Sequence, residues 1–389
     1  MAASNTAARA TPGDRLRITV VGGGVIGLLT ALECATAGAD VVLVEQGRLP
    51  HRRSASYDRH RIVRALHPQD ASATRAAVGA AARWAELTRL LGGGLFHRSG
   101  ALTVMATNQA DAASALLVES GGRSRTLGPA ELARAYGRLR LPAGASAVLE
   151  PDGGVLLADR VLEALVAILN KTPGVQLLPQ NEATRFDPCS GEVRLASGES
   201  LHSDRVVVAA GPWSREVLPA EAVKGTQLFR QTLLYCQLPS ETARSWAGTP
   251  AVPALGTAAG AWLIPPVGDT PLKLTAATAC RPAKRIDGHA APGFWREHLT
   301  DMFHDLVVGF RADWITGAYD AYYLADAETG GPRLVELDGG RSWAYAACGG
   351  SSFKFAPVIA SSLADRVLGR PVTPTGLTHL DQRSPTRSL

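Results

Sequence analysis

Two lysines of this chain stand where a buried cation could take part in chemistry. The chain has 389 residues, with 35 arginines and only five lysines. Lys273 lies in the apolar run 271–274, and Lys354 lies between two phenylalanines. An ammonium group is a compact charge whose pKa falls on burial, so lysine can serve a reaction in ways that arginine cannot. The alternative is that each lysine lies on an edge strand and extends its ammonium group to solvent.

A glycine-rich turn near the start of the chain predicts a site for a dinucleotide. Gly22, Gly24 and Gly27 stand between a β-branched run, 18–21, and a helix-forming run, 28–37. The first glycine would allow a tight turn, the second the close approach of a pyrophosphate, and the third the close packing of helix on sheet. The free N–H groups and positive end of that helix would then face the phosphates.

The acid Glu45 supports the same interpretation. It ends the strand-like run 41–45, 23 residues after Gly22, and an acid at an offset of roughly 20 residues binds a ribose hydroxyl in such sites. A carboxylate there would repel a 2′-phosphate, so we expect no NADP. An ordinary tight turn would give the same pattern, and this segment alone does not separate FAD from NAD.

Composition and charge exclude several classes of function. Hydrophobic residues make up 46% of the chain and charged residues 19%, which is typical of a soluble globular protein long enough for two domains. The net charge of +5 comes from scattered arginines, and no nucleic-acid-binding motif is present, so we expect no nucleic-acid partner. The apolar stretches are shorter than the roughly 20 residues of a membrane span, so we expect no membrane partner.

The cysteines and the N-terminal segment indicate a cytoplasmic protein without a metal. The five cysteines and nine histidines show neither metal-ligand spacing nor a disulfide pattern. Residues 1–13 lack the apolar core of a signal peptide. We therefore expect a reducing compartment and no metal site.

The order of the expected elements indicates one domain inserted into another. Helices are expected over residues 28–37, 71–91, 110–120, 128–136, 159–170, 294–310 and 356–368, and a strand pair over 96–106. We expect an α/β fold (α+β overall), with a Rossmann-like dinucleotide-binding domain built from 16–90, 150–220 and 330–370. An interleaved antiparallel-sheet substrate domain would use 91–149 and 221–329, and 1–15 and 381–389 would be flexible tails.

Several ordered motifs resemble the flavin amine and amino-acid oxidases of the sarcosine oxidase and D-amino-acid oxidase superfamily. They are the glycine turn, the loop 58–64, the turn 152–154, the run 206–214, the run 272–274 and the segment 349–355. The resemblance covers about residues 17–369, and the most similar branch is monomeric sarcosine oxidase with its N-methylamino-acid and pipecolate oxidase relatives. It implies that the dinucleotide is FAD.

The resemblance assigns roles to individual side chains. Arg64 and Lys354 match the pair that holds a substrate carboxylate, which needs cationic partners when it is buried over a flavin. For Arg64 the alternative is a structural ion pair. Lys273 matches the lysine that lies over the flavin and helps to reduce oxygen, since a cation stabilises the negative charge that develops on O₂.

Other matched positions are expected to contact the cofactor. Arg61 matches an arginine beside the flavin, and Gly349 to Ser351 would turn backbone N–H groups toward the flavin edge where negative charge builds on reduction. The full set of expected FAD contacts is Gly22, Gly24, Ile26, Gly27, Glu45, Gln46, Ser54, Arg61, Gly211, Trp213, Gly349, Gly350, Ser351 and Lys354.

Departures from the family pattern shape the expected pocket. The active-site tyrosine is matched by Tyr319, and Gly317 replaces the cysteine that bonds to FAD in sarcosine oxidase, so we expect non-covalent FAD. A family histidine is Ala277 here, and a family tyrosine is Trp262. We therefore expect a bulkier or more apolar substrate than sarcosine, with Lys273, Tyr319 and Trp262 as catalytic residues. The alternative for Trp262 is plain core packing.

The expected reaction is oxidation of a C–N bond in an amino acid or an N-substituted or cyclic amino acid. A hydride equivalent would pass from the substrate to flavin N5, the imine would hydrolyse, and O₂ would take the electrons to give H₂O₂. One alternative is an FAD dehydrogenase or a biosynthetic tailoring oxidoreductase for a larger amine-containing intermediate. A second is a non-catalytic flavin-binding protein, because fold does not fix function. We expect a small-molecule amine or amino acid and O₂ as partners, and a monomer or homodimer.

Overall fold

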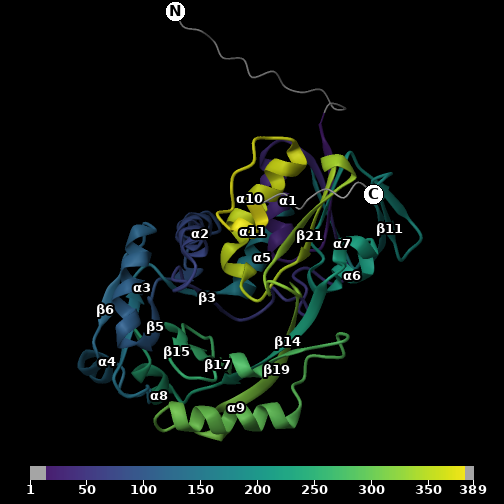
Figure 1. Ribbon diagram of the computed structural model, residues 1–389. Coiled ribbons are helices and arrows are strands. Elements are labelled where there is room, and N and C mark those ends of the chain that lie inside the picture. The colour runs from purple at the N-terminus through teal and green to yellow at the C-terminus, as the bar shows by residue number, and fades with distance from the viewer. Residues whose placement is uncertain (1–14, 382–389) are drawn as a thin grey trace, which may run out of the picture.

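The β-branched runs of the chain build a six-stranded, mainly parallel sheet in the computed structural model, which describes residues 15–381 (Figure 1). Its order is β20-β21-β13-β1-β2-β9. These strands are β1 (Arg17–Val21), β2 (Asp40–Glu45), β9 (Val175–Pro179), β13 (Arg205–Val208), β20 (Arg333–Leu337) and β21 (Ser342–Ala347). Every pairing in it is parallel except that of β20 with β21. Burial on both faces explains why residues 206–208 of β13 form a continuous apolar run and why even Thr19 of β1 is buried.

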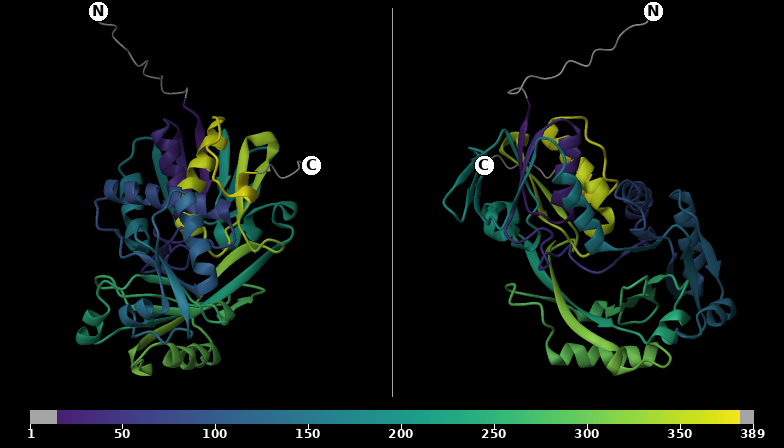
Figure 2. Two further views of the ribbon diagram at one scale, coloured as in Figure 1. Left: turned by 60° about the vertical axis from the view of Figure 1, so that its left-hand side comes forward. Right: turned by 180° about the vertical axis from the view of Figure 1, so that it is seen from behind.

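Helices cover one face of this sheet. Four helices pack there around a shared core: α1 (Val25–Thr36), α2 (Ala71–Leu90), α5 (Ala158–Leu169) and α10 (Ser352–Leu368) (Figure 2). On the other face lie α6 (Ser214–Val217), α7 (Ala220–Val223) and a small sheet of β10 (Ala183–Asp187), β11 (Glu192–Leu195) and β12 (Ser200–His202). This arrangement leaves the carboxyl ends of β1, β2 and β13 free to line a site.

A nine-stranded sheet forms the second half of the structure. Its path is β18-β14-β17-β16-β15-β5-β7-β6, and β19 pairs with β14. The strands are β5 (Ala101–Ala106), β6 (Arg125–Leu127), β7 (Ala145–Glu150), β14 (Thr226–Cys236), β15 (Ala251–Leu255), β16 (Ala261–Ile264), β17 (Leu272–Ala276), β18 (Cys280–Pro282) and β19 (Ile315–Asp326). The helices of this half are α3 (Thr107–Glu119), α4 (Pro129–Ala135), α8 (Ser240–Ser245) and α9 (Gly293–Leu306), the last lying beneath β14 and β19 in Figure 1.

Residues 96–106 do not form the strand pair that the sequence indicated. β4 (Phe96–His97) pairs with β8 (Gly154–Leu156), which also pairs with β3 (Arg61–Val63). β5 instead joins β7 and β15 in the larger sheet. The turn at Gly100, whose φ is +87°, carries the chain from one sheet to the next rather than back on itself.

The α/β class with a Rossmann-like sheet is confirmed, and most helix positions agree with the sequence. The clearest shift is at α10, which begins at Ser352 rather than at residue 356, so that Lys354 lies in its first turn. Pro357 lies inside α10, beyond its first turn. Proline is better tolerated in the first turn of a helix than in its interior, so the sequence favours a helix that starts closer to Pro357.

The strands of the two sheets come from the chain segments that the domain prediction assigned to each. The domain boundaries themselves stay a prediction. The expected tails lie outside the described residues except at their inner ends, where Asp381 is the last residue of α11 (Thr378–Asp381).

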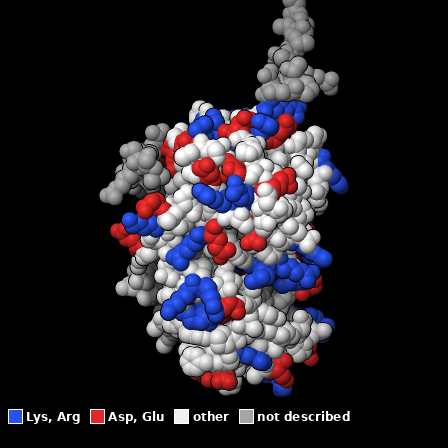
Figure 3. Space-filling view, turned by 90° about the vertical axis from the view of Figure 1, so that its right-hand side faces the viewer, with Lys and Arg blue, Asp and Glu red and all other residues white. Residues whose placement is uncertain are grey.

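On the face shown in Figure 3, basic and acidic side chains are interspersed. No helix within residues 15–381 is long and apolar enough to span a membrane.

Candidate active site

A cavity between the two sheets brings most of the predicted site residues together. Its lining comes from β1, β2, the segment 209–213 after β13 and the starts of α1 and α10 on one side, and from β14, β16, β17 and β19 on the other. Lys273, Trp262 and Arg64 line it, with thirteen of the fourteen expected FAD contacts. The fourteenth, Gly27, lies within α1 rather than in the cavity wall.

The glycine turn closes around the end of α1 as tightly as the pattern predicts. A Cβ at Gly27 would lie 1.9 Å from the carbonyl oxygen of Gly22, and Gly22 itself has a φ of +108°. Both positions therefore require glycine. The N-cap of α1, Gly24, makes no side-chain cap, and Ser56 Oγ accepts from Val25 N at 3.0 Å. The start of the helix, with its remaining N–H groups and its positive end, lines the cavity and suits an anion.

Glu45 lies at the same end of the cavity and is held by its own chain. Its carboxylate accepts from Gly23 N at 2.8 Å and from Gly47 N at 2.9 Å, and His51 Nδ1 lies 2.9 Å away. Burial alone would raise the pKa of this carboxyl, but His51 and the two N–H groups outweigh burial and lower it. His51 in turn stacks on Trp213 with the ring centroids 5.7 Å apart. Glu45 is therefore a fixed, ionised acceptor suited to a ribose hydroxyl.

Two cations and one acid meet at the other end of the cavity. Arg64 and Lys354 both line it, and Arg64 donates to the carbonyl oxygen of Leu66. Glu150 is buried behind them and accepts from Ala65 N at 2.5 Å and from Leu66 N at 3.1 Å through one carboxylate oxygen. The other oxygen, Oε1, is buried without a partner in the described part of the chain.

Burial and mutual repulsion shift the ionisation of this group. Burial, followed by the charge of Arg64, lowers the pKa of Lys354 well below its ordinary value. Burial raises the pKa of Glu150, although Arg64 and Lys354 oppose the change. Burial and the same two cations lower the pKa of His67 to about 2, so this ring stays neutral. A substrate carboxylate beside Arg64 and Lys354 would favour the protonated form of the lysine and balance the positive charge of the pair.

Lys273 forms a buried ion pair with Asp58. Its side chain is 0% exposed, and Nζ contacts Asp58 Oδ2 and lies 3.4 Å from the carbonyl oxygen of His60. Burial lowers the pKa of Lys273 to about 8, although Asp58 opposes the change. The ammonium group lies 5.8 Å from the centroid of Trp262 and 5.6 Å from that of Tyr235. It is thus a cation of reduced basicity at the cavity wall.

Asp58 is the centre of a larger buried cluster. Besides Lys273 it binds Arg61 Nη1 at 3.2 Å, Tyr235 Oη at 2.8 Å and Arg59 N at 2.8 Å. Burial would raise the pKa of Asp58, but Lys273 and Arg61 lower it. Burial and the charge of Lys273 hold the pKa of the neighbouring His60 at about 3.

The structure does not bring Tyr319 to this cavity. Tyr319 is 50% exposed and lines a second cavity beside Tyr235. Gly317 lies against the ring of Tyr319, since a Cβ at Gly317 would lie 2.3 Å from that ring. Ala277, the position of the family histidine, is exposed and does not line the cavity. The tyrosines of this strand that line the cavity are Tyr322 and Tyr323, three and four residues further along β19.

Other lining residues carried no clear sequence signal. Gln231 and Cys348 line the cavity, and Cys280 Sγ lies 3.1 Å from Tyr323 Oη. The resemblance pointed to the loop 58–64, which begins at Asp58, and to the turn 152–154, which follows Glu150, but not to these two acids as site residues. Their partners lie far away in the sequence, so only the fold reveals them.

The arrangement fits FAD. The uncapped helix end and the two obligatory glycines suit a pyrophosphate, Glu45 suits a ribose, and the cavity continues from there to Lys273 and Lys354. No group of side chains within residues 15–381 could hold a metal ion. The site can therefore bind a flavin dinucleotide, a carboxylate and an apolar group together.

Comparisons with known proteins agree with this geometry. The chain is 30% identical over 217 residues to peroxisomal sarcosine oxidase of Mus musculus, a match that covers 55% of this chain and 54% of that protein. It is 30% identical over 235 residues to glycine oxidase of Pseudomonas putida, covering 55% and 62% of the two chains. The chain thus spans about half the length of the first curated relatives that it matches.

Among solved structures, the open form of NikD, "an unusual amino acid oxidase essential for nikkomycin biosynthesis", has the same fold. The TM-score is 0.77 at 19% identity, with 95% of this chain and 98% of NikD covered. The family described as DAO, FAD dependent oxidoreductase, matches residues 17–366. The chain therefore belongs to the DAO family of FAD-dependent oxidoreductases.

Proposed function

We propose that the protein oxidises the C–N bond of an amino acid or of an N-substituted or cyclic amino acid, with O₂ as the electron acceptor. The observation that carries the proposal is the pair of cations, Arg64 and Lys354, at one end of a cavity whose other end suits a dinucleotide. A cationic pair with a single buried counter-ion, Glu150, suits one carboxylate.

Each side chain has a role in this reaction. Arg64 and Lys354 bind the carboxylate and so orient the adjacent carbon atom. Ile62, Trp262 and Ile264 form apolar walls, which favours a substrate with an apolar, cyclic or aromatic group. The flavin supplies the acceptor for a hydride equivalent. Lys273 provides a buried positive charge that stabilises negative charge as O₂ is reduced.

A substrate screen tests the proposal. Purified protein is mixed without oxygen with N-methyl, cyclic and aromatic amino acids, and the visible flavin band is followed. Bleaching by an amino acid, with H₂O₂ formed when air is admitted, is the expected result. Bleaching only by donors without a carboxylate would contradict the proposal. Lys273→Met should slow reoxidation by O₂ and leave the bleaching step intact.

We further propose that FAD is held without a covalent bond and that the protein works in a reducing compartment. All five cysteines are free. The one in the cavity wall, Cys348, is a poor nucleophile, because burial raises its pKa to about 11. Acid precipitation should release the yellow colour into the supernatant, and colour that stays in the pellet would contradict the proposal.

A second candidate is a tailoring oxidoreductase for a larger amine. The second cavity shares Arg61, Leu233 and Ala321 with the first and continues along the same side of β14 and β19. A substrate longer than a single amino acid could extend into it. Bleaching by extended amines and none by free amino acids would favour this candidate.

A further inference from the structure

The amide of Gln231 is held in one orientation at the cavity wall. Its Nε2 donates to Thr275 Oγ1 at 2.7 Å and to the carbonyl oxygen of Ala276 at 2.9 Å, with the carbonyl oxygen of Thr232 at 3.3 Å. Carbonyl oxygens only accept, so the NH₂ group of the amide must face them. No donor to the amide oxygen, Oε1, exists among residues 15–381. Gln231 therefore brings a free acceptor to the cavity.

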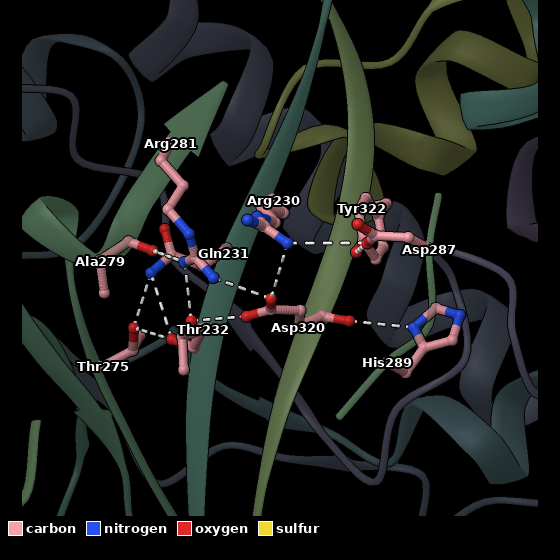
Figure 4. A network of polar contacts seen from close by, with 10 residues as sticks. All are labelled: Arg230, Gln231, Thr232, Thr275, Ala279, Arg281, Asp287, His289, Asp320 and Tyr322. Carbon is pink, nitrogen blue, oxygen red and sulfur yellow. Dashed lines mark hydrogen bonds and ion pairs between the residues drawn. The ribbon is translucent and has the colours of Figure 1, made fainter. Parts of the chain in front are cut away.

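A buried network fixes this orientation (Figure 4). Thr275 Oγ1 donates to the carbonyl oxygen of Thr232 at 2.5 Å, and so it can only accept from Gln231. Thr232 Oγ1 donates to Asp320 Oδ1 at 2.5 Å and accepts from Arg281 Nη1 at 2.8 Å. Arg281 Nη2 closes the network on Asp320 Oδ2 at 2.8 Å. Because Thr232 and Thr275 are fully buried, rotating the amide would leave buried groups unpaired.

The free acceptor belongs to the substrate end of the cavity. Thr275, which holds the amide, is the register partner of Trp262 across β16 and β17. Trp262 lines the cavity together with Arg64 and Lys354. A ligand whose carboxylate binds the cationic pair would place its neighbouring atoms in the part of the cavity that Trp262, Lys273 and Gln231 line.

We propose that Gln231 Oε1 accepts a hydrogen bond from the N–H of the substrate amine and makes the enzyme selective for amines that carry an N–H. The selected substrates would be primary or secondary amino acids, and tertiary amines would be excluded. Thr275, Thr232 and the Arg281–Asp320 pair act as positioning residues. The inference rests on the proposed function, because it requires the carboxylate to bind Arg64 and Lys354.

Two flat, non-oxidisable ligands test the hydrogen bond directly. Pyrrole-2-carboxylate carries an N–H beside its carboxylate, and furan-2-carboxylate carries an oxygen at the same position. The holoenzyme is titrated with each, and the dissociation constant is read from the shift of the flavin spectrum. We expect pyrrole-2-carboxylate to bind about fivefold to tenfold more tightly, which is the usual contribution of one hydrogen bond.

Variants identify the acceptor. Gln231→Met should abolish the preference for pyrrole-2-carboxylate and retain FAD. Gln227→Met is the matched control, since Gln227 lies on the same strand and also donates to backbone carbonyls but lines neither cavity. Thr275→Val, which frees the amide to rotate, should reduce the preference without abolishing it.

The outcomes separate this inference from the proposed function. Equal binding of both ligands by the wild type, or a preference that survives in Gln231→Met, would overturn the role of Gln231 alone. Loss of FAD from Gln231→Met but not from Gln227→Met would make Gln231 a cofactor contact and overturn the inference as well. Failure of both ligands to bind would overturn the carboxylate site, and the inference with it.

Discussion

Replacing Asp58 by asparagine tests the buried charge cluster most sharply. Lys273 has Asp58 as its counter-ion, and its other polar contact is a carbonyl oxygen 3.4 Å away. Removing one partner of a buried pair costs about 3–5 kcal/mol, because the other charge is left uncompensated. Asp58 itself would keep Arg61 at 3.2 Å, Tyr235 at 2.8 Å and Arg59 N at 2.8 Å if Lys273 were removed. We therefore expect Asp58→Asn to lower the free energy of unfolding by more than Lys273→Met, which should cost about 1–3 kcal/mol.

The loss of unfolding free energy in Asp58→Asn should become smaller as the pH rises. The pKa of Lys273 is about 8 in the wild type, and without Asp58 burial lowers it further, so the lysine becomes neutral in the folded variant. The unfolded variant keeps a lysine of ordinary pKa and binds more protons than the folded one, so stability rises with pH. In the wild type Lys273 is protonated in both the folded and the unfolded state below about pH 8, so it adds little pH dependence to the free energy of unfolding there. Between pH 6 and 8 the variant should therefore recover about 1.4 kcal/mol per pH unit relative to the wild type.

Urea unfolding followed by far-UV circular dichroism, with FAD in constant excess, measures both effects. Asp152→Asn, at the exposed ion pair with Arg123, is the control and should change neither the midpoint nor its pH dependence. Two results would refute this account of the cluster: Asp58→Asn being no less stable than Lys273→Met, or a difference in unfolding free energy between Asp58→Asn and the wild type that stays constant from pH 6 to pH 8.

Four further substitutions probe the remainder of the site. Glu45→Ala should yield protein partly depleted of FAD, seen as a lower ratio of flavin to protein absorbance. Gly27→Ala should abolish FAD retention and lower the melting temperature, because its Cβ would lie 1.9 Å from Gly22 O. His60→Phe should lessen acid unfolding, because the pKa of His60 is about 3, so the unfolded state alone gains a proton as the pH falls from about 6.5. Glu150→Gln should tighten binding of pyrrole-2-carboxylate about threefold or more, measured by spectral titration, since it removes the buried charge that competes with the ligand.

Features that depend on local geometry could be predicted from the sequence. Gly27 is required by its contact with Gly22, five residues earlier, Gly22 has a left-handed φ of +108°, and Glu45 follows at the end of the next strand. The scarcity of lysine drew attention to Lys273 and Lys354, and both line the cavity. These features can be predicted because the residues that create them are neighbours in the sequence or belong to a rare residue type.

Features that depend on tertiary pairing could not be predicted in this way. The Asp58–Lys273 ion pair joins residues 215 positions apart. The accepting oxygen of Gln231 depends on hydrogen bonds to β17, more than forty positions away. An acid or an amide in a strand has no sequence feature that reveals which buried group it will meet.

Tyr319 lies on the same strand as the tyrosines that line the cavity, but at a different position along it. Side chains alternate along β19, so Tyr319 and Tyr323 point to the same side, but four residues separate them by roughly 13 Å. The resemblance assigned the active-site role to Tyr319, whereas Tyr322 and Tyr323 are the tyrosines of β19 that line the cavity. Gly317 then lies away from the cofactor cavity, so its lack of a thiol says nothing about flavin attachment. Cys348 is the cysteine that lines the cavity, and burial raises the pKa of its thiol to about 11, which disfavours a covalent bond to FAD.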